Sequence, residues 1–300
     1  MHSLLLSLAL SFGADAADGW KVAEAAHLKN ITQVTRDFVR AGEGYFSPDG
    51  KKAIFQAEEK DSSNPFYQIF VQDIPSGRPL RISPGMGRTT CSYFRPDGKR
   101  VIFASSHGDP DVKKQQEAEI KQREEDRKKG SPPRRYSWSF DPHMKIYETN
   151  PDGTGSKQLT TAPNCYNGGP FFSPDGTKVI FRSDRKEKDR LQLYVINADG
   201  TGEKAITAND KWVYWAPYWY KDGKHIIYTA ADHTDPTARP NYDLFWMNIE
   251  TGKTTRITHA PGQDVLPVFS PDYSKVMWTT SRDGRSPTQL YIADFTPPKE

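Results

Sequence analysis

The stretch FSPDGKKAIF at residues 46–55 decides the fold, because near-copies of it return further along the chain. The copies read FRPDGKRVIF, FSPDGTKVIF, WYKDGKHIIY and FSPDYSKVMW. An Asp-Gly pair between two alternating apolar runs is a strong hairpin signal, since a type I′ turn needs positive φ at its central residues. A calcium loop would need further acidic residues at alternating positions and a distal Glu, which do not follow here. The motif therefore predicts a structural turn and not a set of metal ligands.

The turns recur at a nearly constant interval, apart from one insertion. They begin at Pro48, Pro96, Pro174, Lys221 and Pro271, which are separated by 48, 78, 47 and 50 residues. Each turn is followed by an apolar run, then by an aromatic run such as LQLYVIN (191–197), and then by a short strand. With the aromatic run before each turn, every unit has four strands, which is the composition of a propeller blade. We therefore expect an all-β fold, a β-propeller of five four-stranded blades.

An N-terminal strand is expected to close this propeller. The fifth unit ends after TQLYIAD (288–294) and has no fourth strand before Glu300. The segment Gln33–Thr35 ends 13 residues before Pro48, and the fourth strands of the other units keep nearly the same spacing from the turns that follow them. This segment would complete the last blade and so cover a free sheet edge.

The N-terminus carries an export pattern. Residues 1–16 read MHSLLLSLALSFGADA, an apolar run followed by the small-x-small sequence Ala14-Asp15-Ala16. Such a segment is typical of a signal peptide, and the run is too short to span a bilayer. We expect a signal peptide at 1–16 and a propeller at 17–300; the alternative for the apolar run is a buried strand or short helix. The formal net charge of +3 shows no nucleic-acid or membrane-binding footprint.

The repeat resembles that of the TolB-like β-propeller family, a Pro-Asp-containing relative of the WD-type repeat. The fullest copies are PFFSPDGTKVIFRSDRKEKDRLQLYVINADGTGEKAIT (170–207) and LPVFSPDYSKVMWTTSRDGRSPTQLYIAD (266–294), and the match covers residues 33–295. The resemblance implies an exported propeller; family members include the periplasmic Tol-system protein, propellers of prolyl-oligopeptidase-like peptidases and some polysaccharide lyases. This sequence departs from the Tol-system protein, which usually has six blades and carries an α/β domain ahead of them.

The longer and more variable loops fall on the propeller face opposite the Asp-Gly turns, where function is usually concentrated. One such loop gathers aromatic residues that either pack between blades or form a platform for a peptide or sugar. Cys91 and Cys165 lie in loops of neighbouring blades, and in an oxidising compartment they could form a disulfide. The candidate platform residues are Trp212, Tyr214 and Trp215 of this loop and Tyr166 from the corresponding loop of the previous blade.

An insertion at about 109–135 carries helix signals. Asp109 can cap the helix, Pro110 suits its first position and Gly130 ends it. Because the segment has few apolar residues, we expect it to project into solvent from the variable face. It is either a solvated excursion or a docking arm for an acidic partner. The arm's contact residues would be Arg134, Arg135 and Trp138 at its base.

Catalytic signatures are sparse in this sequence. It has no G-x-S-x-G elbow, no HExxH and no phosphate-binding glycine loop. His107 and His233 occupy equivalent loops of the second and fourth blades; they are either surface histidines or ligands of a divalent metal.

These patterns together favour a protein that binds and does not catalyse. We expect an exported interaction scaffold in the periplasm or cell envelope, in Tol-like transport or envelope maintenance, with an envelope protein as partner. It would have no cofactor, no nucleic-acid partner and no membrane span in the mature chain. The alternative is a polysaccharide lyase or glycoside hydrolase with its site at the propeller mouth, and only that alternative requires the divalent metal.

Overall fold

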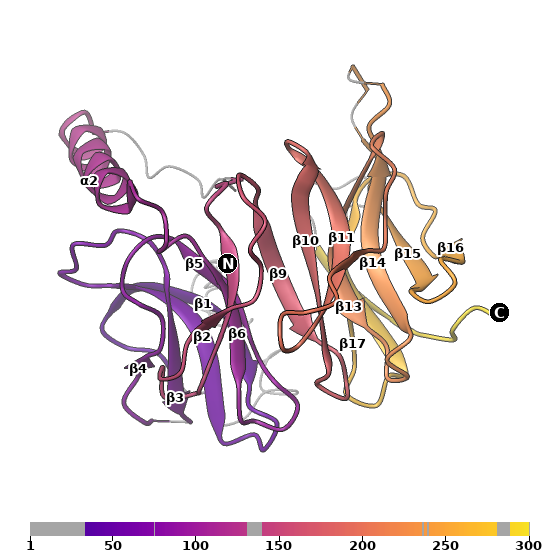
Figure 1. Cartoon of the computed structure of the whole chain (residues 1–300), viewed down its shortest axis with the longest axis horizontal. Coiled ribbons are helices and arrows are strands. Elements are labelled where there is room, and N and C mark those ends of the chain that lie inside the picture. Colours follow the sequence, from indigo (N-terminus) through magenta and orange to yellow (C-terminus); the bar gives the residue numbers. More distant parts are fainter. Residues whose placement is uncertain are drawn as a thin grey trace, which may run out of the picture. The chain divides into compact units, whose positions relative to one another are not determined.

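The computed structural model describes residues 34–74, 76–130, 140–235, 237–238, 240–280 and 289–299. Residues 37–300 form one compact unit, and all the described strands lie in it (Figure 1). The expected signal peptide lies outside the described residues. Within them, no helix combines the length and the hydrophobicity that a membrane crossing requires.

The strands form five antiparallel sheets in the order of the chain, and each sheet is one blade of a β-propeller. The predicted all-β propeller with five blades is therefore confirmed. Blade 1 consists of β1 (Phe38–Phe46), β2 (Lys52–Glu59), β3 (Gln68–Asp73) and β4 (Leu80–Arg81). Blade 2 consists of β5 (Thr89–Phe94), β6 (Val101–Ser105), β7 (Lys145–Thr149) and β8 (Lys157–Gln158).

Blades 3 to 5 repeat this order. Blade 3 consists of β9 (Asn167–Phe172), β10 (Lys178–Glu187), β11 (Arg190–Asn197) and β12 (Lys204–Ala205). Blade 4 consists of β13 (Trp212–Trp219), β14 (His225–Asp232), β15 (Asp243–Asn248) and β16 (Thr254–Arg256). The described part of blade 5 consists of β17 (Asp264–Phe269), β18 (Lys275–Thr280) and β19 (Gln289–Asp294). Gln33 lies outside the described residues, so closure of blade 5 by Gln33–Thr35 stays a prediction.

The hydrophobic core lies between neighbouring blades, because the apolar runs of the central strands are buried on both faces. One cluster joins blades 1 and 2 through residues such as Ile54 and Phe103. Equivalent clusters join blades 2 and 3, blades 3 and 4, and blades 4 and 5. Side chains of consecutive blades thus interdigitate as in face-to-face sheet packing.

The repeated turn is structural, as predicted, but its type differs from the prediction. The Gly50 N–H donates to the Ser47 carbonyl oxygen at 2.9 Å, and Gly50 has φ +69° whereas Asp49 does not enter the left-handed region. This is a type I turn followed by a left-handed residue, not a type I′ turn. The Asp49 carboxylate accepts from the Ser47 hydroxyl at 2.6 Å and the Lys51 N–H at 3.1 Å. The Asp side chain of the motif therefore makes hydrogen bonds within its own turn.

The insertion contains helix α2 (Val112–Lys128), which lies on the side of the molecule opposite the repeated turns (Figure 1). It does not simply project into solvent, as the sequence led us to expect, because polar side chains attach it to blade 1. The Arg123 guanidinium pairs with Glu58 at 2.6 Å and donates to the Pro65 carbonyl oxygen at 2.8 Å. The buried Gln116 amide donates to the Ser63 carbonyl oxygen and accepts from the Gly87 N–H.

Candidate functional site

A shared backbone irregularity shapes the centre of the propeller. The pairing register shifts inside the innermost strand of every blade, which marks a β-bulge. At each bulge one residue adopts the left-handed conformation, with φ between 48° and 57°. We call these five residues the bulge ring: Glu43, Cys91, Gly169, Ala216 and Leu266.

The bulge ring lines a cavity of about 590 Å³, which we call the upper cavity. Most of the rest of its wall is apolar, and it includes Trp215 and Tyr242, whose rings meet edge to face at 6.0 Å. Phe140 and Tyr242 both lie between the second and third strands of their blades, so the cavity lies toward the variable face, where the sequence placed function. The volume and the apolar wall are typical of a pocket for a small ligand or a partner's side chain.

An aromatic layer forms the floor of the upper cavity. Tyr45, Tyr93, Phe171 and Tyr218 occupy equivalent positions, each three residues before the start of its turn. Neighbouring rings in this layer meet edge to face, at 5.3 Å for Tyr45 with Tyr93 and 5.2 Å for Tyr93 with Phe171. Burial raises the pKa values of Tyr45 and Tyr218 far above the usual range, so both phenols stay neutral.

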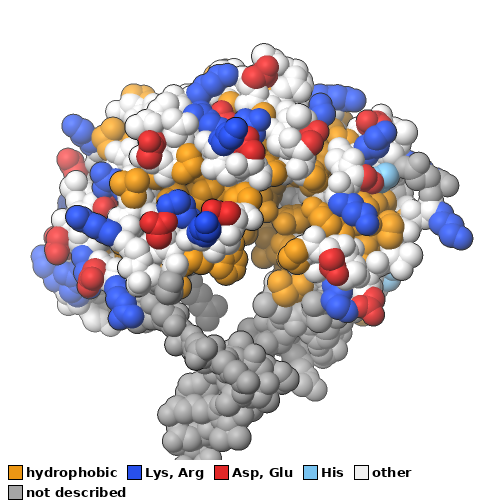
Figure 2. Space-filling view, turned by 90° about the horizontal axis from the view of Figure 1, so that it is seen from below, with side chains coloured by type: hydrophobic (Ala, Val, Ile, Leu, Met, Phe, Trp, Pro, Cys, Tyr) orange, Lys and Arg blue, Asp and Glu red, His pale blue; other side chains and the backbone are white. Residues whose placement is uncertain are grey.

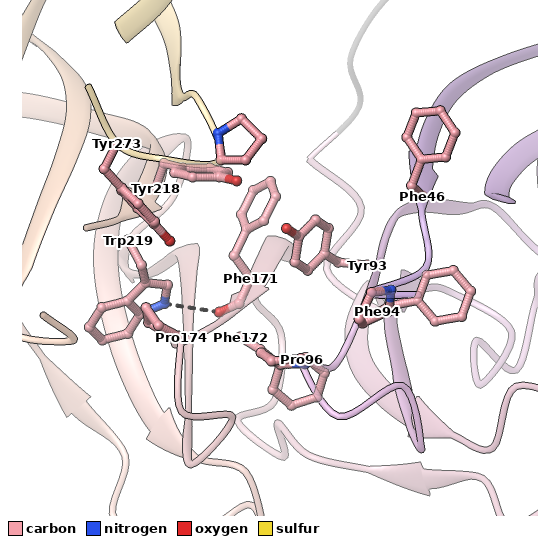
Figure 3. Close-up of a pocket in the computed structure, with 12 residues that line it drawn as sticks. Phe46, Tyr93, Phe94, Pro96, Phe171, Phe172, Pro174, Tyr218, Trp219 and Tyr273 are labelled. Carbon is pink, nitrogen blue, oxygen red and sulfur yellow. Dashed lines mark hydrogen bonds between the residues drawn. The ribbon is translucent and has the colours of Figure 1, made fainter. Parts of the chain in front are cut away.

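Beneath this layer a second cavity of about 420 Å³ opens toward the repeated turns (Figure 3). Figure 3 shows Phe171 between Tyr93 and Tyr218, and these rings line it together with turn residues such as Pro96 and Pro174. Figure 2, seen from this side, shows hydrophobic side chains gathered in the middle and charged side chains around them. Since Phe171 and Tyr218 line both cavities, the aromatic layer separates them.

Three polar groups converge on one wall of the upper cavity: Glu43, Cys91 and Arg182. Arg182 comes from β10 and approaches the bulge of β9, where a Cβ on Gly169 would lie 2.4 Å from its Nη1 atom. Its Nη2 donates to the Tyr166 hydroxyl at 3.2 Å. Glycine at 169 is therefore what admits the guanidinium, and the left-handed φ there suits glycine as well.

The electrostatics of this wall do not favour a cysteine nucleophile. Glu43 is reached by solvent through the cavity but is surrounded by protein atoms, so desolvation raises the pKa of its carboxyl while the Arg182 charge opposes that rise. Burial, and then the nearby Glu43, raise the pKa of the Cys91 thiol to about 11. At neutral pH the thiol is therefore protonated, and reactive cysteines need the opposite shift.

The structure divides the aromatic residues singled out from the sequence. Trp215 lines the upper cavity, but Trp212 and Tyr214 pack into the core between blades 3 and 4. Alternate residues of a strand face opposite sides of the sheet, which explains the division. Tyr166 is fully buried and holds Arg182 instead of contacting solvent. Arg134, Arg135 and Trp138 lie outside the described residues.

The histidines and cysteines singled out from the sequence lie apart in separate environments. The ring centroids of His107 and Tyr147 lie 4.2 Å apart, and the His233 Nε2 atom lies 2.8 Å from the Tyr242 hydroxyl oxygen. Burial lowers the pKa values of both histidines. Cys91 and Cys165 are free thiols in the structure, so the disulfide considered from the sequence is not made here. Cys165 donates to the Ala162 carbonyl oxygen, whereas the bulge turns Cys91 to the cavity.

Sequence reasoning missed the bulge ring and Arg182. All five ring residues stand five residues before the start of their turns, but they are Glu, Cys, Gly, Ala and Leu, so no residue type marks the position. Only this constant spacing from the turn could have indicated them.

No protein-family model matches this sequence, and no curated protein matches it. Among solved structures, the chain is similar to TolB from Acinetobacter baumannii, with a TM-score of 0.56 and 21% identity over 85% of this chain and 52% of that one. A putative TolB from Agrobacterium tumefaciens gives a TM-score of 0.55 and 17% identity over 88% and 78% of the chains. An oligogalacturonate lyase in complex with manganese gives a TM-score of 0.56 and 17% identity over 91% of this chain and 70% of that one.

At these identities the likeness shows the fold alone, and the predicted resemblance to TolB-like propellers is confirmed at that level. The chain spans about half the length of the Acinetobacter TolB. Because the similar structures include both TolB proteins and enzymes, the shared fold does not decide between binding and catalysis.

Proposed function

We propose that this chain is a non-catalytic interaction propeller of the periplasm or cell envelope, which holds an apolar side chain of a partner protein in the upper cavity. The observation that carries the proposal is the cavity of about 590 Å³, whose apolar wall is built by all five blades. Full burial of a Leu or Phe side chain there would contribute about 2–3 kcal/mol. The likeness of the fold to TolB proteins supports an envelope location.

The composition of the cavity wall supports binding over glycoside hydrolysis. Hydrolysis of a glycosidic bond uses a pair of carboxyl groups that flank it. Among the described residues that line the upper cavity, Glu43 is the one carboxylic acid, and Arg182 lies close enough to interact with its charge. The alternative of a polysaccharide lyase at this mouth draws its support from the likeness to the manganese-bound oligogalacturonate lyase.

The test places a photo-crosslinking amino acid at Trp215 in the cavity, and separately at Leu80 on the outer strand β4 as the matched control. In living cells we expect one discrete crosslinked protein from position 215 and none from position 80. Val213→Trp, which fills the cavity from the wall, should weaken binding of that purified protein about 30-fold, the equivalent of about 2 kcal/mol.

A parallel assay separates the two functions. Cleavage of oligogalacturonate by the purified chain, lost in Glu43→Gln, together with no discrete crosslink at position 215, would replace the binding proposal with a lyase. No cleavage, with a crosslink that Val213→Trp removes, is the outcome that we expect.

A further inference from the structure

A second cluster of chemical groups lies outside the upper cavity, where the insertion leaves and rejoins blade 2. Asp109 precedes α2, while Asp141 and His143 follow the insertion. One ligand atom from each residue lies within 4.8 Å of the others. Of the two histidines that the sequence suggested as metal ligands, neither belongs to this group.

The charge balance of the cluster is unusual. The side chains of Asp109 and Asp141 are 1% and 4% exposed, although a buried carboxylate needs a compensating charge or full hydrogen bonding. Asp109 accepts hydrogen bonds from the Asp111 N–H and the Gln115 amide. The Oδ1 atom of Asp141 accepts a hydrogen bond from the backbone N–H of His143, but its buried Oδ2 atom has no hydrogen-bond partner among the described residues.

The cations nearby do not complete the set. Lys145 interacts with the charge of Asp141, yet its ammonium donates to the carbonyl oxygens of Pro142 and Cys165. His143 lies 3.3 Å from Asp109 and 3.7 Å from Asp141, measured from its Nδ1 atom to a carboxylate oxygen, and its side chain is 41% exposed. The cluster can therefore be reached from solvent on the histidine side.

The distances suit a small divalent metal. Two ligands held about 2.1 Å from a tetrahedral Zn²⁺ lie about 3.4 Å from each other. The Nδ1 atom of His143 is 3.3 Å from Asp109 Oδ2 and 3.7 Å from Asp141 Oδ1, so the second pair would shorten by a few tenths of an ångström. The ligand atoms of the two carboxylates lie within 4.8 Å of each other, and they would also draw together around the ion. One imidazole and two carboxylates form a mixed set that favours Zn²⁺ or Mn²⁺ over Mg²⁺, which prefers oxygen ligands alone.

The geometry points to a divalent transition-metal site formed by Asp109, Asp141 and His143, with solvent completing the coordination. A bound ion would neutralise the two buried carboxylates and fasten together the two ends of the insertion. It would also fix Phe140, the neighbour of Asp141, which lines the upper cavity. The site thus sets the position of α2 and of one cavity wall.

The experiment is calorimetric titration of the metal-stripped full chain with Zn²⁺, with Mg²⁺ as the comparison ion. We expect one Zn²⁺ per chain, and at least tenfold weaker binding in Asp141→Asn and in His143→Gln. The second variant changes a partly exposed side chain and so guards against misfolding. His107→Ala, outside the cluster, is the matched control and should bind as the unmodified chain does.

A second readout reports on structure. Zn²⁺ should slow amide hydrogen exchange at residues 109–116 and 140–144 in the unmodified chain, and not in His143→Gln. Absence of saturable Zn²⁺ binding, or binding that both variants retain, would overturn the proposal. Because neither readout needs a bound partner, this outcome does not depend on whether the upper cavity binds one.

Discussion

At the scale of the residue, the bulge ring holds four non-glycine residues in a left-handed conformation. This conformation costs an L-residue about 1–2 kcal/mol, and such strain persists only where the surrounding structure imposes it. Here the β-bulge imposes it, and the bulge directs one residue of each innermost strand toward the upper cavity. Blade 3 alone relieves the strain with glycine, and it does so where Arg182 approaches the backbone.

In the bulge ring, replacing glycine by alanine and replacing alanine by glycine should therefore have opposite effects on the stability of the fold. Gly169→Ala should destabilise the chain by about 2–3 kcal/mol, because it adds left-handed strain and forces Arg182 away. Ala216→Gly should be neutral or stabilise by up to about 1 kcal/mol, since relief of strain offsets the added freedom of the unfolded chain. Urea unfolding midpoints measure both.

A matched control lies in blade 1. A Cβ on Gly42 would meet nothing within 4 Å, and its φ is not left-handed, so Gly42→Ala should change the midpoint little. Equal destabilisation by Gly42→Ala and Gly169→Ala would show that neither the bulge conformation nor Arg182 sets the requirement for glycine.

At the scale of the element, α2 shows how a polar helix can be held without an apolar face. Glu58 on β2 is buried and receives Arg40 on one oxygen, at 2.9 Å, and Arg123 on the other, at 2.6 Å. Arg123 also pairs with Glu119 within the helix at 2.8 Å. Charge-assisted contacts to a buried carboxylate are stronger than exposed ion pairs, so the helix is fastened where the insertion crosses blade 1.

Arg123→Ala should release α2 from blade 1. It leaves one oxygen of the buried Glu58 without Arg123, and we expect a loss of about 1–2 kcal/mol, discounted for the partial exposure of the arginine. Amide hydrogen exchange of residues 112–128 should become at least several-fold faster. Lys121→Ala, at an exposed position of the same helix, is the control and should leave exchange unchanged. Identical exchange in the two variants would mean that the helix is held by other contacts.

At the scale of the whole molecule, the parts that the sequence predicts are those set by local chemistry. Alternating apolar runs and the Gly or Pro residues at turns predict the strand order and the five blades. Each of these patterns can be recognised within a segment of a few residues. The bulge ring could not be predicted this way, because tertiary pairing sets its conformation and its five residue types share no property. Likewise, only the return of the insertion to blade 2 brings together Asp109, Asp141 and His143. The amino-acid pattern of α2 also does not show that Gln116 and Arg123 make polar contacts with other parts of the chain.

Ring closure is the remaining prediction at this scale. Hydrophobic clusters join each blade to the next from blade 1 to blade 5, and the described part of blade 5 ends at β19. If Gln33–Thr35 is the fourth strand of that blade, Val34→Pro removes a backbone N–H from its ladder with β19 and hinders the strand. Amide exchange in Gln289–Asp294 should then become about tenfold faster, and the unfolding midpoint should fall. Ala25→Pro, upstream of the predicted strand, should do neither. Unchanged exchange in Val34→Pro would show that another segment, or another chain, covers the edge of blade 5.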